Sequence, residues 1–190
     1  WISVNNNSFP EEDIRQGICN RLDKYTEGLL IIAKNPNVQK ELMKLIQNNV
    51  IKREYVAILE GKLKAKTITI NCPISRLKNG GTKMEVTSNI NAKNAITHFS
   101  IIKNYSGLTL VKCILETGRT HQIRVHAKYI MSPVLNDPLY GNSHPKDNYQ
   151  QYLVANRIHF HDPLTNSYVD VILELPEQFN NYLKDIQSET

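Results

Sequence analysis

The sequence predicts a single α+β domain built around a β-sheet. Strand-like runs dominate the middle of the chain, and segments with helical periodicity interrupt them and close the chain. The 190 residues contain neither an internal repeat nor a domain linker, and 41% of them are hydrophobic, which is enough for one sizeable core. We therefore expect one domain that spans residues 1–190.

The chain opens on a polar stretch, residues 1–12, which is typical of a loop. The apolar run from Leu29 to Ala33 then predicts a short strand buried on both faces, which would hold the preceding loop in place. That loop carries four charged residues: Arg21, Asp23, Lys24 and Glu27. Taken alone, it is more typical of a solvated ion pair than of a reactive carboxylate.

A helix follows directly. Asn35 is a favoured N-cap residue and Pro36 suits the first helical position. Apolar residues recur at helical spacing from Val38 to Leu45, so we expect an amphipathic helix that ends near Asn48.

The stretch from Arg53 to Glu60 predicts a strand with Tyr55, Ala57 and Leu59 on one face, because alternate side chains of a strand share a face. Three lysines alternate after it: Lys62, Lys64 and Lys66. This basic strip could contact phosphates, although lysines that protect an exposed sheet edge are the more common explanation.

Strands are also predicted at residues 67–72 and 83–87, with a flexible basic loop from Arg76 to Lys83 between them. Two hairpins follow in the chain. Residues 95–102 and 108–115 form the first, and residues 154–161 and 167–175 form the second, around Asp162-Pro163.

Two further helices complete the prediction. Thr120 is the expected cap of a helix that begins at His121 and carries Arg124, with Arg119 at its start. A loop is expected from residue 136 to residue 149, and a last helix from Pro176 onward.

Composition limits the environment and the partners. The formal charge of +5 and a pI near 9.0 are consistent with a polyanionic partner. The three cysteines are widely spaced and contain no C-x-x-C pair, which favours a reducing compartment over a disulfide framework. No apolar run approaches the roughly 20 residues of a membrane span. We expect an intracellular protein, in the cytoplasm or an organelle.

Four sequence blocks together resemble the RluA-type family of RNA pseudouridine synthases. They are R-L-D-x-x-T-x-G-L-L-I-I-A-K from Arg21, R-E-Y-V-A-I-L-E-G from Arg53, L-E-T-G-R-T-H-Q-I-R-V-H from Leu115 and N-D-P-L-Y-G from Asn136. The resemblance implies a mixed, mainly antiparallel sheet with flanking helices. It also implies a catalytic domain that lacks the upstream strand and Asn-Lys-Pro loop usual in the family.

The resemblance also implies roles for single residues. Asp23 would be catalytic, Arg124 would pair with it, and Tyr55 would stack on the uracil and help to remove the proton from carbon 5. Arg21 would fill the space left by a flipped base, or contact a phosphate, or form a simple ion pair. We expect an RNA-binding groove lined by Arg21, Arg119, Arg76, Lys62, Lys64 and Lys66.

Three positions depart from the family pattern. Asn20 stands where His is usual, Glu27 where Ser is usual, and Asn136 where Gly usually precedes Asp-Pro. None of them removes the aspartate, the tyrosine or the arginine of the expected site.

Pseudouridine formation exchanges no electrons overall and loses no group, so we expect no cofactor. His121 and His126 are five residues apart and do not share a helical face, while His159 and His161 lack a third ligand, so no metal site is predicted. The expected partner is ribosomal or transfer RNA, bound by a monomer that contacts no membrane.

Two alternatives remain open. One is a non-catalytic RNA-binding relative that kept the scaffold, although such a protein needs no carboxylate facing a phosphate backbone. The other is a carboxylate glycosidase, which requires a second carboxylate; Asp137 and Glu116 are the candidates.

Overall fold

A computed structural model of the chain describes residues 16–142, 148–162 and 165–188. The predicted opening loop, part of the loop from residue 136 to residue 149, and Pro163 of the predicted second hairpin lie outside these ranges. Within them, a seven-stranded sheet has the order β1-β8-β2-β7-β6-β3, with β9 also paired to β8. Its strands are β1 (Glu27–Gly28), β2 (Lys52–Glu60), β3 (Thr67–Asn71), β6 (Ile96–Asn104), β7 (Leu108–Leu115), β8 (Leu153–His161) and β9 (Tyr168–Ile172).

The pairing of β1 with β8 is parallel, and the other pairings of this sheet are antiparallel. The expected mixed, mainly antiparallel sheet is therefore confirmed. Strand β2 lies at its centre, and seven of its nine residues are buried.

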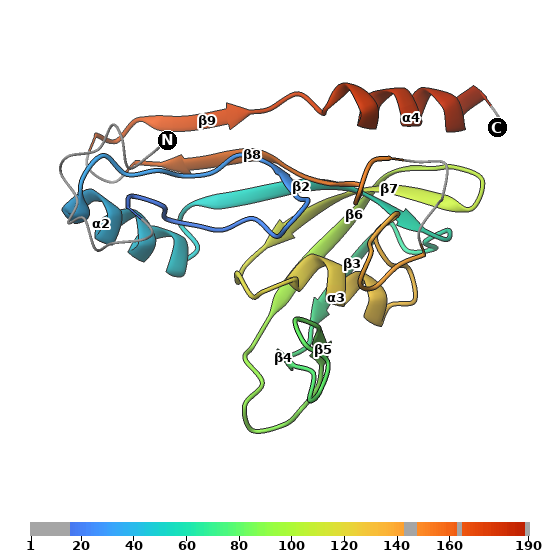
Figure 1. The fold of residues 1–190 in the computed structure, drawn as a ribbon. Coiled ribbons are helices and arrows are strands. Elements are labelled where there is room, and N and C mark those ends of the chain that lie inside the picture. Colours follow the sequence, from blue (N-terminus) through green and yellow to red (C-terminus); the bar gives the residue numbers. More distant parts are fainter. Residues whose placement is uncertain (1–15, 143–147, 163–164, 189–190) are drawn as a thin grey trace.

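Helices cover both faces of this sheet, as Figure 1 shows. Tyr55, Ala57 and Leu59 of β2 share one core with Ile123 and Ala127 of helix α3 (Gln122–Tyr129). The intervening residues of β2 lie in a second core with helix α4 (Glu177–Ser188). The alternation predicted for this strand is thus confirmed, and each face of β2 packs against a different helix.

The helix predicted after Asn35 is also confirmed as α2 (Pro36–Gln47). The side chain of Asn35 accepts a hydrogen bond from the backbone N–H of Val38 at 3.0 Å, which satisfies one of the free donors at the helix start. No residue of α2 is fully buried.

The strand predicted from Leu29 to Ala33 is wrong. Only Glu27–Gly28 forms a strand, and Leu30 and Ile32 are 43% and 42% exposed. The segment instead runs back along the chain before it, since Cys19 N–H donates to Ile31 O and the two stretches form an antiparallel bridge. A short apolar run predicts extended backbone, but it does not show which neighbour covers the side chains.

Gly28 brings this segment against β8. A Cβ on Gly28 would lie 2.3 Å from the carbonyl oxygen of Ala155, and the φ angle of Gly28 is +130°. Only glycine tolerates both the close approach and this backbone conformation. The loop before Gly28 is therefore held by the parallel pairing of β1 with β8 rather than by a buried strand.

The predicted cap of α3 is wrong as well. The helix begins at Gln122, and His121 occupies the N-cap with a left-handed φ of +56° and no side-chain cap. The hydroxyl of Thr120 instead accepts a hydrogen bond from Arg21.

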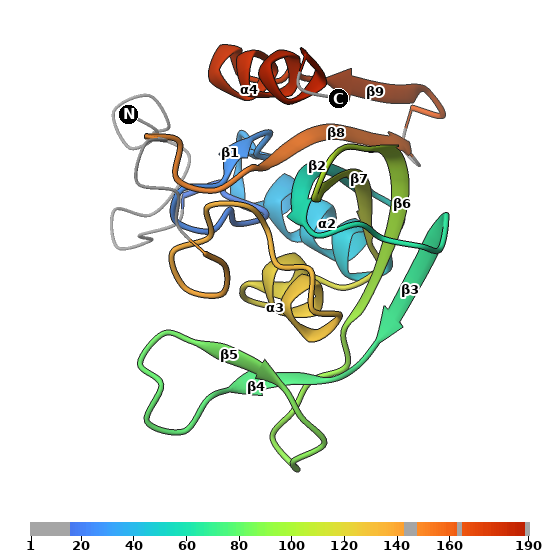
Figure 2. The same ribbon diagram turned by 90° about the vertical axis from the view of Figure 1, so that its right-hand side faces the viewer.

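A two-stranded hairpin, β4 (Ile74–Arg76) with β5 (Met84–Val86), projects away from the main sheet (Figure 2). A small apolar cluster that includes Ile74, Val125 and Tyr140 attaches it to α3. The hairpin therefore packs against the helix that carries Arg124.

The three cysteines are free. Among the helices of the described residues, none combines the length and apolar character needed to cross a bilayer.

Candidate active site

A cleft of about 870 Å³ opens between the loop that carries Asp23, helix α2 and the start of α3. Its floor includes Tyr55 and Arg53 of β2, and its wall includes the segment from Leu115 to Thr120. Met43 and Ile46 of α2 also line the cleft, so part of the apolar face of that helix faces it. The volume is within the range of pockets that hold small molecules.

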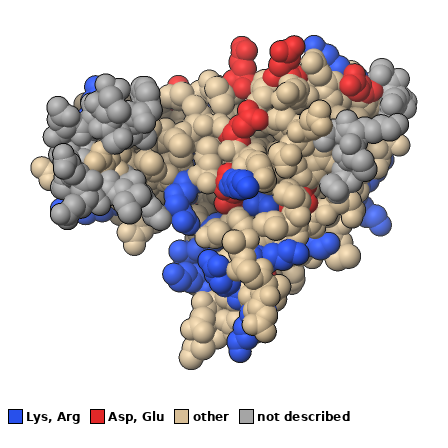
Figure 3. All heavy atoms as spheres, in the orientation of Figure 1, with Lys and Arg blue, Asp and Glu red and all other residues tan. Residues whose placement is uncertain are grey.

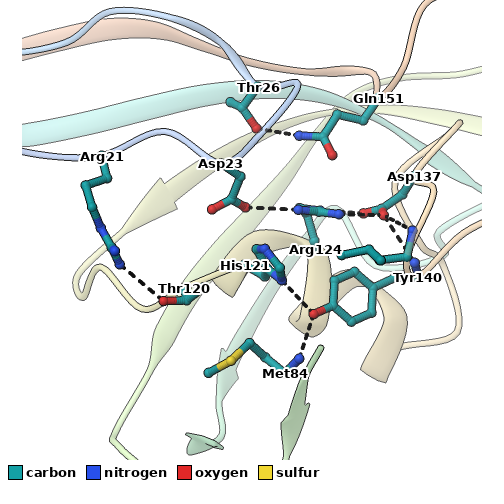
Figure 4. A network of polar contacts seen from close by, with 11 residues as sticks. Arg21, Asp23, Thr26, Met84, Thr120, His121, Arg124, Asp137, Tyr140 and Gln151 are labelled. Atoms are coloured by element: carbon teal, nitrogen blue, oxygen red, sulfur yellow. Dashed lines mark hydrogen bonds and ion pairs between the residues drawn. The ribbon is translucent and has the colours of Figure 1, made fainter. Parts of the chain in front are cut away.

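Asp23 lies at a turn on the rim of this cleft, where the N–H of Thr26 donates to its backbone carbonyl at 3.0 Å. Its side chain remains 24% exposed. The Thr26 hydroxyl accepts a hydrogen bond from the amide of Gln151, a residue with no exposed surface (Figure 4). Gln151 thus fixes the turn to the segment before β8, and no sequence pattern indicated it.

Arg124 lies between the two carboxylates of the site, Asp23 and Asp137 (Figure 4). Its Nε and Nη2 donate to the two carboxylate oxygens of Asp137 at 2.7 and 2.8 Å. Its Nη1 faces Asp23 Oδ2 at the longer distance of 3.4 Å. The geometry therefore brings Asp23 and Arg124 together, with the tighter contacts on the side away from the cleft.

Asp137, which the sequence offered only as a candidate second carboxylate of a glycosidase, is the buried partner of Arg124. It has no exposed surface, and its Oδ1 also accepts hydrogen bonds from the N–H groups of Leu139 and Tyr140. Its neighbour Asn136 adopts a left-handed φ of +57°. Glycine adopts this conformation readily and asparagine tolerates it, which explains why asparagine can replace the usual glycine here. The N-D-P-L-Y-G block was the available signal.

Electrostatics keep the guanidinium charged. Burial lowers the pKa of Arg124, but its hydrogen bonds and charge interaction with Asp137, and then the charge of Asp23, more than offset this and leave the pKa raised. A bidentate, charge-assisted pair of this kind fixes orientation as well as charge.

Tyr55 is 6% exposed and lines the cleft beside Asp23. Burial raises the pKa of its phenol; the charge of Arg53 lowers it and the charge of Asp23 raises it further. The phenol consequently keeps its proton at neutral pH.

A hydrogen-bonded pair joins the β4–β5 hairpin to this centre. The Tyr140 hydroxyl accepts from the N–H of Met84 in β5 and contacts His121 Nδ1, both at 2.8 Å, and the ring of Tyr140 lies 5.2 Å from the guanidinium of Arg124. Burial lowers the pKa of His121. A neutral His121 accepts the hydroxyl hydrogen, so the Tyr140 hydroxyl both donates a hydrogen bond to His121 and accepts one from Met84.

A second, smaller cavity of about 240 Å³ lies between the hairpin and the cleft, and it is basic. Lysine and arginine side chains gather around the hairpin in Figure 3. The lining includes three of the predicted RNA-binding residues, and also Lys93, which the sequence reasoning missed: Arg21, Arg76, Arg119 and Lys93.

Neutral oxygens orient these arginines. Arg21 donates to the Thr120 hydroxyl, Arg76 to the carbonyl of Gly81, and Arg119 to the carbonyl of Asn94. Within the described part of the chain, none of the three forms an ion pair with a carboxylate. Their charges therefore remain available to an anionic partner.

The lysine strip lies elsewhere. Lys62, Lys64 and Lys66 are exposed around the buried Leu63, and they line neither of the two cavities.

The histidines have ordinary partners. His126 contacts Thr97 and the carbonyl of Cys72, and His159 contacts Glu54 and Tyr168. The described residues contain no group of three potential metal ligands.

Comparison with known proteins gives a consistent result. The family model described as RNA pseudouridylate synthase matches residues 2–129. The uncharacterized RNA pseudouridine synthase YlyB of Bacillus subtilis is 40% identical over 174 residues, which cover 92% of this chain and 57% of that protein. The ribosomal large subunit pseudouridine synthase D of Nitrosomonas europaea is 39% identical over 164 residues, which cover 86% of this chain and 41% of that protein. The chain thus spans about half the length of the curated relatives it matches.

Solved structures share the fold. Human RNA pseudouridylate synthase domain containing 4 superposes with a TM-score of 0.75 at 21% identity, over 90% of this chain and 75% of that chain. Human RNA pseudouridylate synthase domain containing 1 gives 0.72 at 22% identity, over 90% and 80%.

A prediction about stability follows from the buried ion pair between Arg124 and Asp137. Arg124→Met removes the cation and leaves the carboxylate of Asp137 buried without a counter-charge, so the free energy of unfolding should fall by about 3–5 kcal/mol. Urea denaturation measures this change. The double variant Arg124→Met with Asp137→Leu should be more stable than the single variant, because it removes the stranded charge. A single variant within about 1 kcal/mol of the parent would show that the pair contributes little beyond an exposed ion pair.

Proposed function

Because the chain belongs to the RluA-type family of RNA pseudouridine synthases, we propose that it isomerises a specific uridine of ribosomal or transfer RNA to pseudouridine. The observation that carries the proposal is the position of Asp23, which faces a nucleotide-sized cleft and is paired from behind with a buried arginine. A carboxylate in such a place is held ready to react.

The chemistry assigns a role to each group. The bond between uracil N1 and ribose C1′ breaks, the uracil turns, a bond forms between C5 and C1′, and C5 loses a proton. Asp23 acts at the anomeric carbon. Arg124 orients the carboxylate of Asp23, since its guanidinium cannot turn away without losing Asp137. The reaction is redox-neutral and needs no cofactor.

Tyr55 stacks on the uracil and assists the removal of its C5 proton in this proposal. Its raised pKa makes it a neutral phenol rather than a phenolate. Its hydroxyl can therefore take part in removing the C5 proton only by passing on its own hydrogen.

The glycosidase alternative is not supported by the two carboxylates that it requires. Both oxygens of Asp137 are bound to Arg124, and Asp137 has no exposed surface. Glu116 lines the cleft but pairs with His98 at 2.6 Å. Asp137 is therefore closed off from the cleft and Glu116 is engaged by His98, so neither supports the role of the second carboxylate.

RNA would enter across the basic cavity. Arg21, Arg76 and Arg119 offer unpaired charge beside the cleft, so phosphates flanking the flipped uridine would lie against the hairpin. The strip formed by Lys62, Lys64 and Lys66 would contact RNA only if the bound RNA extends beyond these cavities.

The catalytic role proposed for Asp23 can be tested by substitution. Asp23→Asn keeps the shape of the side chain but removes its charge and basicity, so pseudouridine formation should be abolished while folding and RNA affinity stay close to those of the parent. Release of tritium from RNA labelled at uracil C5 measures turnover. Comparable turnover of the parent and the variant would disprove the catalytic assignment. An inactive parent on total cellular RNA would count against the proposed activity itself.

A further prediction concerns the basic cavity. The combined variant Arg76→Glu and Arg119→Glu should weaken RNA binding and lower the slope of log affinity against log salt, since each neutralised phosphate contributes about 0.9 to that slope for a duplex and about 0.7 for a single strand. Fluorescence anisotropy across a salt series measures both. Lys62→Glu with Lys64→Glu is the matched control with the same change in charge. Equal losses in the two variants would mean that the cavity has no special role.

A further inference from the structure

Arg53 is a largely buried cation to which the described residues supply no partner. It is 8% exposed, and its Nε is fully buried and makes no hydrogen bond. Within the described residues, no hydrogen bond or ion pair involves its side chain, although the guanidinium lines the cleft. Buried charges are normally paired, because their removal from water otherwise costs several kcal/mol.

Three carboxylates that are adjacent to Arg53 in sequence or line the same cleft, Glu54, Glu116 and Asp23, each face another basic side chain. Glu54 is adjacent in sequence but lies on the other face of the strand, where its carboxylate is within 4 Å of Arg157, His159 and Lys112. Glu116 also lines the cleft, but it pairs with His98. Among the described residues, no carboxylate forms an ion pair with Arg53, so its charge remains open to an anion that enters the cleft.

We propose that Arg53 binds a phosphate group of the nucleotide whose base enters the cleft. A phosphate supplies the full negative charge that a uracil carbonyl lacks, and a guanidinium fork matches its oxygens. The inference rests on the proposed function in that the phosphate belongs to the target uridine of an RNA.

The position of Arg53 suits this role. Arg53 and Tyr55 are two residues apart on one strand, so their side chains share a face at a spacing of about 7 Å. This spacing is comparable to the separation of base and phosphate within one nucleotide. A uracil stacked on Tyr55 would therefore place its own phosphate over Arg53.

Gly118 leaves room for such a ligand. A Cβ at this position would lie 3.0 Å from Nη1 of Arg53, so any side chain would press on the guanidinium. Gly118 also lines both cavities, together with Arg21 and Arg119. A phosphate above Arg53 would thus lie where the cleft meets the basic cavity, in line with the remainder of the RNA backbone.

Thermal unfolding in millimolar inorganic phosphate, compared with chloride at equal ionic strength, tests the proposal without RNA. Phosphate should raise the midpoint of the parent, because a ligand that binds only the folded state stabilises it. Arg53→Met should lose most of this rise, while its midpoint in chloride should equal or exceed that of the parent, because an unpaired buried charge is removed. Arg53→Lys should recover part of the rise, since it restores the charge without the fork.

Arg157→Met is the matched control. It removes the same charge from a surface arginine that is paired with Asp170, and it should keep the full response to phosphate. A parent without a phosphate-dependent rise, or Arg53→Met with the rise intact, overturns the proposal. Neither outcome depends on whether the protein isomerises uridine.

RNA provides the second readout. Loss of one charge-assisted contact should raise KM about tenfold or more in Arg53→Met. An active Arg53→Met enzyme with the KM of the parent would also overturn the assignment.

Discussion

The site depends on the bidentate ion pair between Arg124 and Asp137. Both side chains are almost completely buried, and Asp137 is also fixed by two backbone N–H groups of its own turn. Two edges of the guanidinium are thereby used, and only Nη1 faces Asp23. The pair fixes the orientation of the Arg124 guanidinium, and the guanidinium in turn orients the partly exposed carboxylate of Asp23. It also joins α3 to the following loop, whose Tyr140 connects to the β4–β5 hairpin.

The arginines around this pair divide into three kinds. Arg124 is paired with the carboxylates of Asp137 and Asp23 and is held in one orientation. Arg21, Arg76 and Arg119 are oriented by neutral oxygens and keep their charge for a partner. Arg53 lines the cleft, and no described residue forms a hydrogen bond or an ion pair with its side chain. Free arginines along a path from the hairpin to the cleft are what recognition of a phosphate backbone requires.

Much of the fold could be predicted because local signals were strong. The Asn35-Pro36 helix start, the alternation of β2 and both long hairpins follow from rules that involve neighbouring residues only. The run from Leu29 to Ala33 was misassigned because its exposure depends on which distant segment covers it. The start of α3 was misplaced because Thr120 is recruited by Arg21, which is 99 residues away in sequence.

The candidate site was also predicted only as far as local sequence patterns reach. The sequence blocks indicated Asp23, Tyr55 and Arg124, and the structure brings them together. The supporting residues Asp137, Gln151 and Lys93 come from loops with no periodicity, and their importance follows from contacts that only the folded chain makes. Asp137 lies in the N-D-P-L-Y-G block, but nothing local in that block shows that its partner is an arginine thirteen residues earlier.

The single-turnover rate of Asp137→Asn tests the central claim most directly. Asparagine can still accept one hydrogen bond from Arg124, but it cannot hold both edges of the guanidinium by charge. Asp137 does not face the cleft, so RNA affinity should match that of the parent while the rate of pseudouridine formation falls by about 10²-fold, the scale expected when a reacting group is misplaced by about 1 Å. Thermal unfolding would verify that the variant is folded. A folded variant that reacts at the rate of the parent would contradict the claim that Arg124 must be fixed from behind for Asp23 to act.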